Sequence, residues 1–162
     1  MNIQDLFRLA MKRDIPELLE FDGPAVDVGA SGKAVAPGAI PLGLPSWSFP
    51  HNLPFDDESV ATLHAYHFLE HLSGDDVIDF LHEAERVMIP GRSVMNFCVP
   101  YFSSVLQAQD LTHKSAWSEE TFNTLFSNPW YNPAGKWELR VHALMIAGIV
   151  NRNLCLIGQL VR

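Results

Sequence analysis

The sequence lacks long apolar runs and is poor in cysteine. No uninterrupted apolar stretch reaches the roughly 18 residues that a membrane-spanning helix needs, and the first 19 residues contain no apolar run of signal-peptide length. The two cysteines, Cys98 and Cys155, both lie inside apolar runs and have neither the spacing of a zinc site nor that of a disulfide framework, so we expect buried free thiols and no metal site. We therefore expect a cytoplasmic protein with no membrane segment.

Basic residues are also scarce. The chain has 11 Lys and Arg against 19 Asp and Glu, a formal net charge of −8, and the basic residues form no stripe. A surface that follows a phosphate backbone is therefore not expected, although a small-molecule ligand is compatible with this charge. With 162 residues and 48% apolar content, we expect a single domain over residues 1–162, with an N-terminal helical segment at about 1–20.

Apolar periodicity predicts strands that alternate with helices. The expected strands include short ones at Ala25–Val28 and Ile40–Leu44, separated by a loop rich in Gly, Ser and Pro. Beyond the loop at 45–58, we expect strands at 60–66 and 93–100 and helices at 2–12, after Pro16, at 75–88 and from Ser118. A helical start at Phe68 is an alternative to one at Asp75. Two apolar stretches flanking Asn151-Arg152-Asn153 predict a terminal antiparallel hairpin at the sheet edge.

This order of elements is typical of the α/β class. A glycine loop after the first strand and alternating strands and helices predict a doubly wound, Rossmann-like sheet. The connection between the first two strands is too short for a full crossover helix, so we expect an abbreviated βαβ unit. The apolar C-terminus adds the antiparallel hairpin.

Four ordered segments carry a resemblance to a known family: AVDVGASGK, NLPFDDESV, HFLEHL and FLHEAERVMIPGRSVMNFCVP. A fifth segment, THKSAWSEETFNTLF, adds a weaker similarity. From about Ala25 to Phe126 the chain resembles the class I S-adenosylmethionine-dependent methyltransferases, as a small and abbreviated member. The resemblance implies S-adenosylmethionine as cofactor and methyl transfer to an acceptor that the sequence does not identify.

The resemblance also implies where the cofactor would bind. Gly29 would let the backbone approach the ligand closely, and Asp27 would hold the loop or reach the donor's amine through water. His67, Glu70 and His71 would form part of the crevice wall at the carboxyl end of a central strand. No catalytic residue is assigned, because the sulfonium methyl is already activated and a general base is needed only if the acceptor must lose a proton. The expected cofactor-binding residues are Asp27, Gly29, Ala30, Ser31, Gly32, Leu53, Pro54, Phe55, His67 and His71.

Three positions depart from the family pattern. Ser31 replaces the second glycine of the loop, Gly43 replaces the acidic residue that binds the ribose hydroxyls, and Phe49 replaces an aspartate near the adenine. Stacking of Phe49 or Trp47 on the adenine could compensate, and a core or lid role for these aromatics is the alternative. The departures leave open a methyltransferase-like domain that acts as a binding or assembly subunit, with a protein partner or a second copy of the chain.

The histidine spacing allows further interpretations. His64, His67 and His71 are spaced i, i+3 and i+7, which on one helix would place them on one face and suggest zinc or a metal-dependent hydrolase. Against this, His64 falls in a predicted strand and is expected to point elsewhere. Structural histidines that are satisfied by Glu70 or by backbone groups are a third possibility.

Overall fold

The computed structural model describes residues 5, 18–131, 137–147 and 153–162. The helices expected at 2–12 and after Pro16 lie largely outside these ranges, and residues 18–20 are not helical. In the described ranges, no helix is long and apolar enough to cross a membrane.

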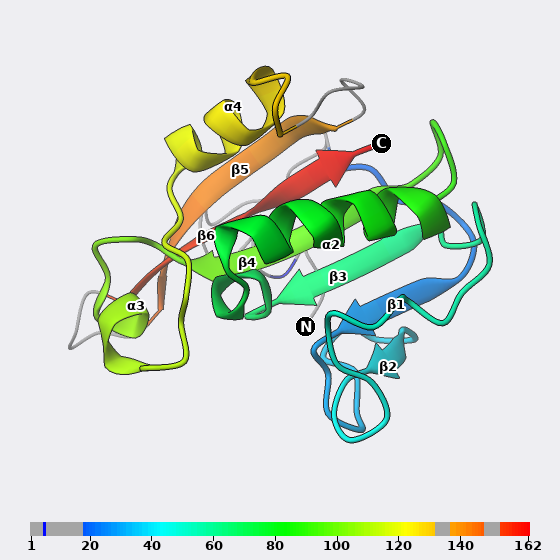
Figure 1. Ribbon diagram of the computed structural model, residues 1–162, viewed down its shortest axis with the longest axis horizontal. Helices are drawn as coiled ribbons and strands as arrows, with labels where there is room; N and C mark the ends of the chain where they lie inside the picture. Colours follow the sequence, from blue (N-terminus) through cyan, green and yellow to red (C-terminus); the bar gives the residue numbers. More distant parts are fainter. Residues whose placement is uncertain (1–4, 6–17, 132–136, 148–152) are drawn as a thin grey trace.

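A six-stranded sheet forms the centre of the molecule, in the order β2-β1-β3-β4-β6-β5 (Figure 1). Strands β1, β2, β3 and β4 pair in parallel, and β6 pairs antiparallel with both β4 and β5. The α/β sheet with a C-terminal antiparallel hairpin is therefore confirmed, with β5 at the outer edge. The strands span Ala25–Val28 (β1), Ile40–Leu42 (β2), Thr62–Tyr66 (β3), Val94–Pro100 (β4), Glu138–Ala147 (β5) and Asn153–Val161 (β6).

Most strand predictions hold, with shorter ends. The first strand has the predicted bounds, whereas β2 ends at Leu42 and leaves Gly43 free to turn. Val60 forms only an isolated bridge with Met88, so β3 begins at Thr62. All seven residues of β4 are buried, as expected for a central strand that is covered on both faces.

The helices span Gly74–Val87 (α2), Val105–Gln109 (α3) and Glu119–Ser127 (α4), and a short 3₁₀ turn, η1, spans Leu69–His71. Capping boxes at Ser73 and Ser118 begin α2 and α4, since each hydroxyl accepts a hydrogen bond from the backbone N–H three residues later. The sequence missed α3. Of the two helix starts that the sequence left open, Phe68 and Asp75, the second is the one observed to within one residue, since α2 begins at Gly74 after the Ser73 cap.

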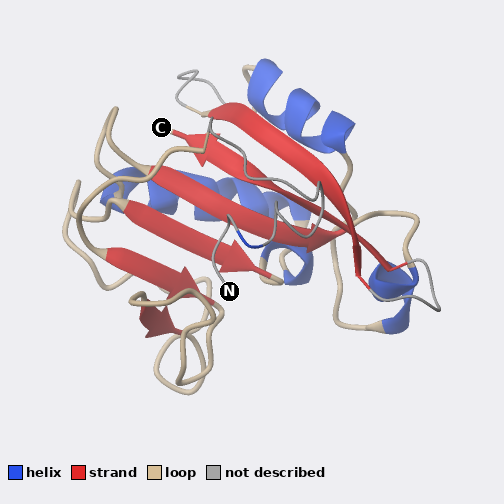
Figure 2. Ribbon diagram, turned by 180° about the vertical axis from the view of Figure 1, so that it is seen from behind, coloured by secondary structure: helices blue, strands red, loops and turns tan. Residues whose placement is uncertain are grey.

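One face of the sheet carries α2 and α4, as the views from both sides show (Figures 1 and 2). The buried stripe of α2 includes Val77, Phe80 and Leu81. Under α4, the rings of Phe97 and Phe122 stack with centroids 4.4 Å apart, and Trp117 lies 4.9 Å from Phe122. These aromatic contacts make the α4 side of the core largely aromatic.

A row of buried polar residues crosses the other face of the sheet. The strand registers place Asp27 beside His64, His64 beside Asn96, and Asn96 beside Gln159. Gln159 donates from Nε2 to Asn96 Oδ1 at 2.9 Å, and His64 Nδ1 lies 3.1 Å from the Tyr66 hydroxyl. Burial lowers the pKa of His64. His64 therefore belongs to this polar row, and its side chain points away from α2 as expected.

The cap of α2 gives a first testable expectation. Replacing Ser73 with Ala removes the acceptor for the Asp76 N–H and should lower the free energy of unfolding by about 1 kcal/mol. Chemical denaturation of the variant beside Ser103→Ala, at an exposed serine, measures the difference. Equal stability of the two variants would show that the capping box contributes nothing.

Candidate functional site

A cleft of about 440 Å³ lies beyond the carboxyl ends of β1, β2 and β3. Parallel sheets typically bind ligands at this place, and the volume suits a small molecule. Its walls come from the glycine loop after β1, from residues 44–50 and from the turn that joins β3 to α2. Gly29, Ser31, His67 and His71 of the predicted set line it, and the others do not.

Gly29 is required by two features of the backbone. Its φ is +86°, and its N–H donates to the Leu42 carbonyl at 2.7 Å, which ties the glycine loop to β2. A Cβ at this position would meet the ring of Phe68 at 3.0 Å. The backbone of Gly29 therefore lies close to Phe68, and it also lines the cleft.

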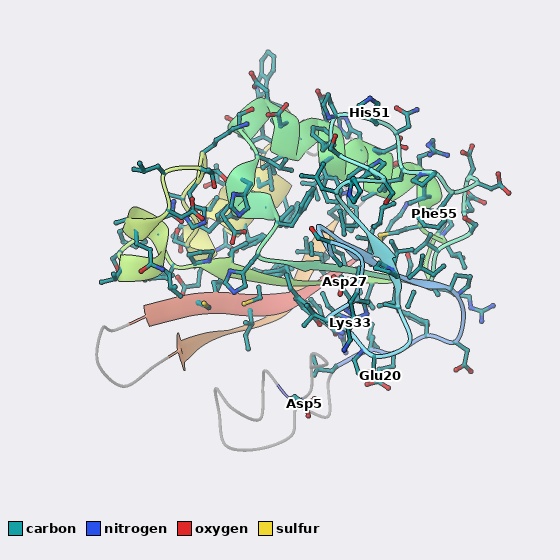
Figure 3. All side chains as sticks on the ribbon, turned by 90° about the horizontal axis from the view of Figure 1, so that it is seen from below. Asp5, Glu20, Asp27, Lys33, His51 and Phe55 are labelled. Carbon is teal, nitrogen blue, oxygen red and sulfur yellow. The ribbon has the colours of Figure 1, made fainter. Side chains whose placement is uncertain are left out.

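Asp27 holds the loop between β1 and β2. Its buried carboxylate accepts hydrogen bonds from the N–H of Val35 at 2.6 Å and of Ala36 at 3.1 Å. Figure 3 shows Asp27 at the level of the sheet, with Lys33 on the side away from α2. Of the two roles expected for this residue, the structure shows loop support.

Gly43 explains the missing carboxylate at the end of the second strand. A Cβ built there would lie 2.8 Å from the carbonyl oxygen of Ala30 and 3.1 Å from the carbonyl carbon of Gly29. No side chain fits unless the glycine loop moves, because real Cβ atoms do not approach backbone atoms so closely. The space at Gly43 is therefore too small for the acidic side chain that the family pattern has at this position.

Aromatic rings also line the cleft. Trp47 and Phe49 both line the cleft, and each also has a packing partner: Trp47 lies 6.2 Å from Phe68 and Phe49 lies 6.0 Å from Phe80, between ring centroids. The Trp47 indole N–H donates to the Asn52 carbonyl at 3.0 Å. Trp47 is buried, whereas Phe49 is half-buried and keeps part of its ring accessible.

The remaining predicted residues lie near the cleft without lining it. Ala30 is buried beneath the loop, and Gly32 is exposed. Leu53, Pro54 and Phe55 follow the cleft-lining loop on the α2 side of the sheet, where Figure 3 labels His51 and Phe55. Glu83 and Arg86 of α2 bind this segment, because Glu83 accepts from the Leu53 N–H and Arg86 donates to the carbonyls of Leu53 and Phe55.

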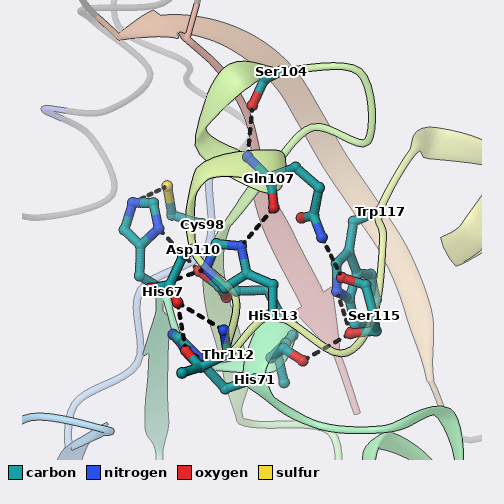
Figure 4. Close-up of polar contacts among 12 residues, drawn as sticks. His67, His71, Cys98, Ser104, Gln107, Asp110, Thr112, His113, Ser115 and Trp117 are labelled. Atoms are coloured by element: carbon teal, nitrogen blue, oxygen red, sulfur yellow. Dashed lines mark hydrogen bonds and ion pairs between the residues drawn. The ribbon is translucent and has the colours of Figure 1, made fainter.

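His67 and His71 occupy different surroundings (Figure 4). His67 Nδ1 lies 3.0 Å from Glu70 Oε1, and its Nε2 lies 3.7 Å from Cys98 Sγ. His71 Nδ1 lies 3.0 Å from the Thr112 hydroxyl, and its ring centroid lies 4.8 Å from that of His113. Glu70 binds His67, as in the structural interpretation, whereas the partner of His71 is a threonine hydroxyl, and both histidines line the cleft.

Two groups of side chains in the described residues bring possible metal ligands within 4.8 Å of one another: His67 with Cys98 and Cys155, and Glu70 with His71 and His113. His64 belongs to neither group, so the helical spacing of three histidines does not produce the site it suggested. Sequence reasoning missed the first group, because its members come from three separate strand ends.

The side chains of His67, Cys98 and Cys155 shift one another's pKa values. Hydrogen bonds from Cys98 and His67 lower the pKa of the Cys155 thiol, and contacts with Cys155 and Glu70 raise the pKa of His67. A hydrogen bond to Cys155, together with burial, raises the pKa of Cys98. The two thiols and the imidazole therefore lie close enough to influence one another's protonation.

Comparison with solved structures finds S-adenosylmethionine-dependent methyltransferases. One from Thermotoga maritima, described as a possible histamine N-methyltransferase, matches with a TM-score of 0.61 and 16% identity, over 99% of this chain and 89% of its own. One from Methanosarcina mazei matches with a TM-score of 0.55 and 12% identity, over 82% and 72%. A structure concerned with the conversion of a disulfide bond into a thioacetal group during echinomycin biosynthesis matches at 0.51 and 14%, over 88% and 76%.

These likenesses confirm the predicted architecture. The chain has the class I fold of the S-adenosylmethionine-dependent methyltransferases. No protein-family profile matches the sequence, and no curated protein matches it.

The glycine loop can be tested with two substitutions. Gly32 also has a positive φ, of +79°, but a Cβ there would meet nothing within 4 Å. Gly32→Ala should cost about 1 kcal/mol of unfolding free energy through backbone strain alone. Gly29→Ala should cost about 2–3 kcal/mol, because the methyl group also pushes against Phe68. Denaturant unfolding of both variants checks this, and equal costs would contradict the Phe68 contact.

The clamp on Leu53 has a predicted pH dependence. The hydrogen bond from Arg86 holds the pKa of Glu83 below its usual 4.5. Because the folded pKa is the lower one, the stabilisation is present above about pH 4.5 and is lost as the pH falls through the folded pKa. Glu83→Gln should cost about 1 kcal/mol at pH 7 and progressively less below pH 4.5. Unfolding across this range, with the exposed Asp79→Asn as control, measures it; a difference independent of pH would contradict the assignment.

Proposed function

We propose that the chain binds S-adenosylmethionine in the cleft beyond β1, β2 and β3 and transfers its methyl group to an acceptor that is still unidentified. The observation that carries the proposal is the position of the cleft, at the end of a class I sheet and against a tight glycine turn. Its volume of about 440 Å³ lies in the range of ordinary small-molecule sites.

Charged residues at the cleft complement an amino-acid end of a donor. Lys114 and Asp76 both line it, and hydrogen bonds from Ser73 lower the pKa of Asp76, so this carboxylate is charged at neutral pH. Lys114 would attract a carboxylate and Asp76 an ammonium group. The half-buried Phe49 would offer a ring face to an adenine, and Trp47 and Ser48 line the cleft from the same loop.

When bound, the donor's sulfonium supplies an already activated methyl group. The protein would then act mainly by holding the donor and the acceptor in line and by excluding water. Gly29 and Ser31 would support the donor with their backbone, and His71 faces the same space. This division of work requires few chemically specialised residues.

The crowding at Gly43 favours one second candidate. The ribose-binding carboxylate is absent and could not be accommodated, because any side chain would collide with Ala30. A lost charged hydrogen bond typically costs about 1.5–3 kcal/mol. A methyltransferase-like domain that no longer uses the donor and works as a binding or assembly subunit is therefore the alternative.

Calorimetric titration with S-adenosylmethionine and S-adenosylhomocysteine tests the proposal. We expect dissociation constants of roughly micromolar size, or about −8 kcal/mol. Ser31→Phe places a ring in the cleft and should weaken binding at least tenfold. Lys33→Phe, two residues along the same loop, exposed and outside the cleft, should leave it unchanged.

The outcomes separate the two candidates. Binding that Ser31→Phe weakens and Lys33→Phe does not supports the donor site. No heat of binding up to millimolar ligand, with the protein folded, would overturn it and favour the binding-subunit alternative. Equal loss in both variants would show that the loop, and not the cleft, was disturbed.

A further inference from the structure

We infer that His67, Cys98 and Cys155 form a binding site for one zinc ion, at the ends of β3 and β4 on the sheet face opposite α2. The inference goes beyond the proposed function and does not depend on it. It stands on the convergence of three ligand atoms within 4.8 Å of one another, on the partner of His67, and on a buried carboxylate without a second partner.

The sheet itself brings the ligands together. Cys155 lies opposite Pro100, and Ile157 lies opposite Cys98 in the antiparallel β4–β6 pair. Since alternate residues of a strand share a face, Cys98 and Cys155 are diagonal neighbours on one face. The backbone N–H of His67 donates to the Cys98 carbonyl at 2.8 Å, which fixes the third ligand beside them.

The spacing matches that of a zinc site. Bonds of about 2.3 Å from zinc to sulfur and about 2.0–2.1 Å to nitrogen place tetrahedral S and N ligands about 3.5–3.8 Å apart. Cys98 Sγ and His67 Nε2 are 3.7 Å apart. The pair therefore requires almost no movement to share an ion.

Glu70 supplies the supporting contact that zinc-bound histidines usually have. Its Oε1 lies 3.0 Å from His67 Nδ1, so a proton on Nδ1 leaves the Nε2 lone pair directed at the thiols. Such carboxylate–histidine pairs orient the ring and raise its basicity toward a metal.

The same carboxylate has an incomplete set of hydrogen-bond partners. The Glu70 side chain is 0% exposed, and its Oε2 has no hydrogen-bond partner in the described part of the chain. A buried polar oxygen without a partner is unfavourable. A divalent ion held by the adjacent imidazole would offset this cost.

The ligand types select the metal. Two thiolates and one imidazole suit zinc and are poor ligands for magnesium or calcium. Three protein ligands leave a fourth position, and the half-exposed His67 side chain, at 50%, places that position near solvent. Zinc binding would displace the protons that the thiols and the imidazole otherwise carry, and water would complete the coordination.

The competing group, Glu70 with His71 and His113, is less suited to this ion. His71 Nδ1 contacts Thr112, and His113 Nδ1 contacts the Gln107 carbonyl (Figure 4). This group contains no sulfur, so thiolate ligation distinguishes the two sites experimentally.

Cobalt(II), a spectroscopic probe for zinc sites, provides the test. The full chain, purified under reducing conditions and stripped with a chelator, is titrated with Co²⁺ and then with Zn²⁺. We expect one Co²⁺ per chain, a cobalt–thiolate charge-transfer band, and stoichiometric displacement by zinc. Cys98→Ser and Cys155→Ser should each weaken the band and the affinity. Glu70→Gln should lower zinc affinity about 10–100-fold, whereas His82→Gln, at an exposed position on α2, should change neither.

Two results would overturn the inference. One is the absence of a thiolate band in the unaltered protein when a thiol reagent counts both cysteines as free. The other is zinc binding that survives both cysteine substitutions and disappears in His113→Gln. The first result is obtained with the unaltered protein. The inference can therefore be refuted even if the cysteine variants do not fold. Donor calorimetry is a separate measurement, so a failure of the proposed function leaves the cobalt result interpretable.

Discussion

Parallel pairing of β1, β3 and β4 is the constraint on which both candidate sites depend. It makes the three strands end at one edge of the sheet, so that the turns after them meet although they are far apart in the sequence. The cleft forms where the turns after β1 and β3 approach each other, with Phe68 against Gly29. The cluster of His67, Cys98 and Cys155 forms at the neighbouring strands, where β6 lies beside β4.

Much of this architecture can be predicted from the sequence, because the local residue patterns of the strands and helices are consistent with the fold as a whole. The valines of β1 before Gly29, the apolar run of β4 and the acidic first turn of α2 each have one structural solution that fits their neighbours. The short α3 was missed because its five residues bury no side chain, and such a helix leaves no periodic pattern. The strand neighbours of β6 could not be read either, since apolar content does not specify which strand a hairpin joins.

The candidate site was less predictable, for a related reason. Loop residues such as Gly29 and Ser31 follow a strand directly, so their position at the cleft follows from the strand. Leu53, by contrast, is placed by Glu83 and Arg86 of a helix 30 residues away, and no local pattern signals that clamp. The proximity of Cys98 and Cys155 likewise depends on the register between β4 and β6. A shift of one residue would place the two side chains on opposite faces of the sheet. From the sequence, both thiols were correctly predicted to be buried, but their spacing along the chain gave no indication of a shared metal site.

The two histidines of the HFLEHL segment have different chemical capacities, which their spacing conceals. Both nitrogens of His67 face partners, Glu70 on one side and Cys98 on the other. A general base needs a free nitrogen within hydrogen-bond reach of the proton it removes, so His67 can shape the cleft but is poorly placed to accept a proton from a ligand there. His71 contacts Thr112 through Nδ1 only, and it lines the same cleft. The two histidines therefore differ in how many ring nitrogens are bound by neighbours in the described part of the chain. His67 lines the cleft and also contacts Cys98, so it connects the cleft wall with the two cysteines.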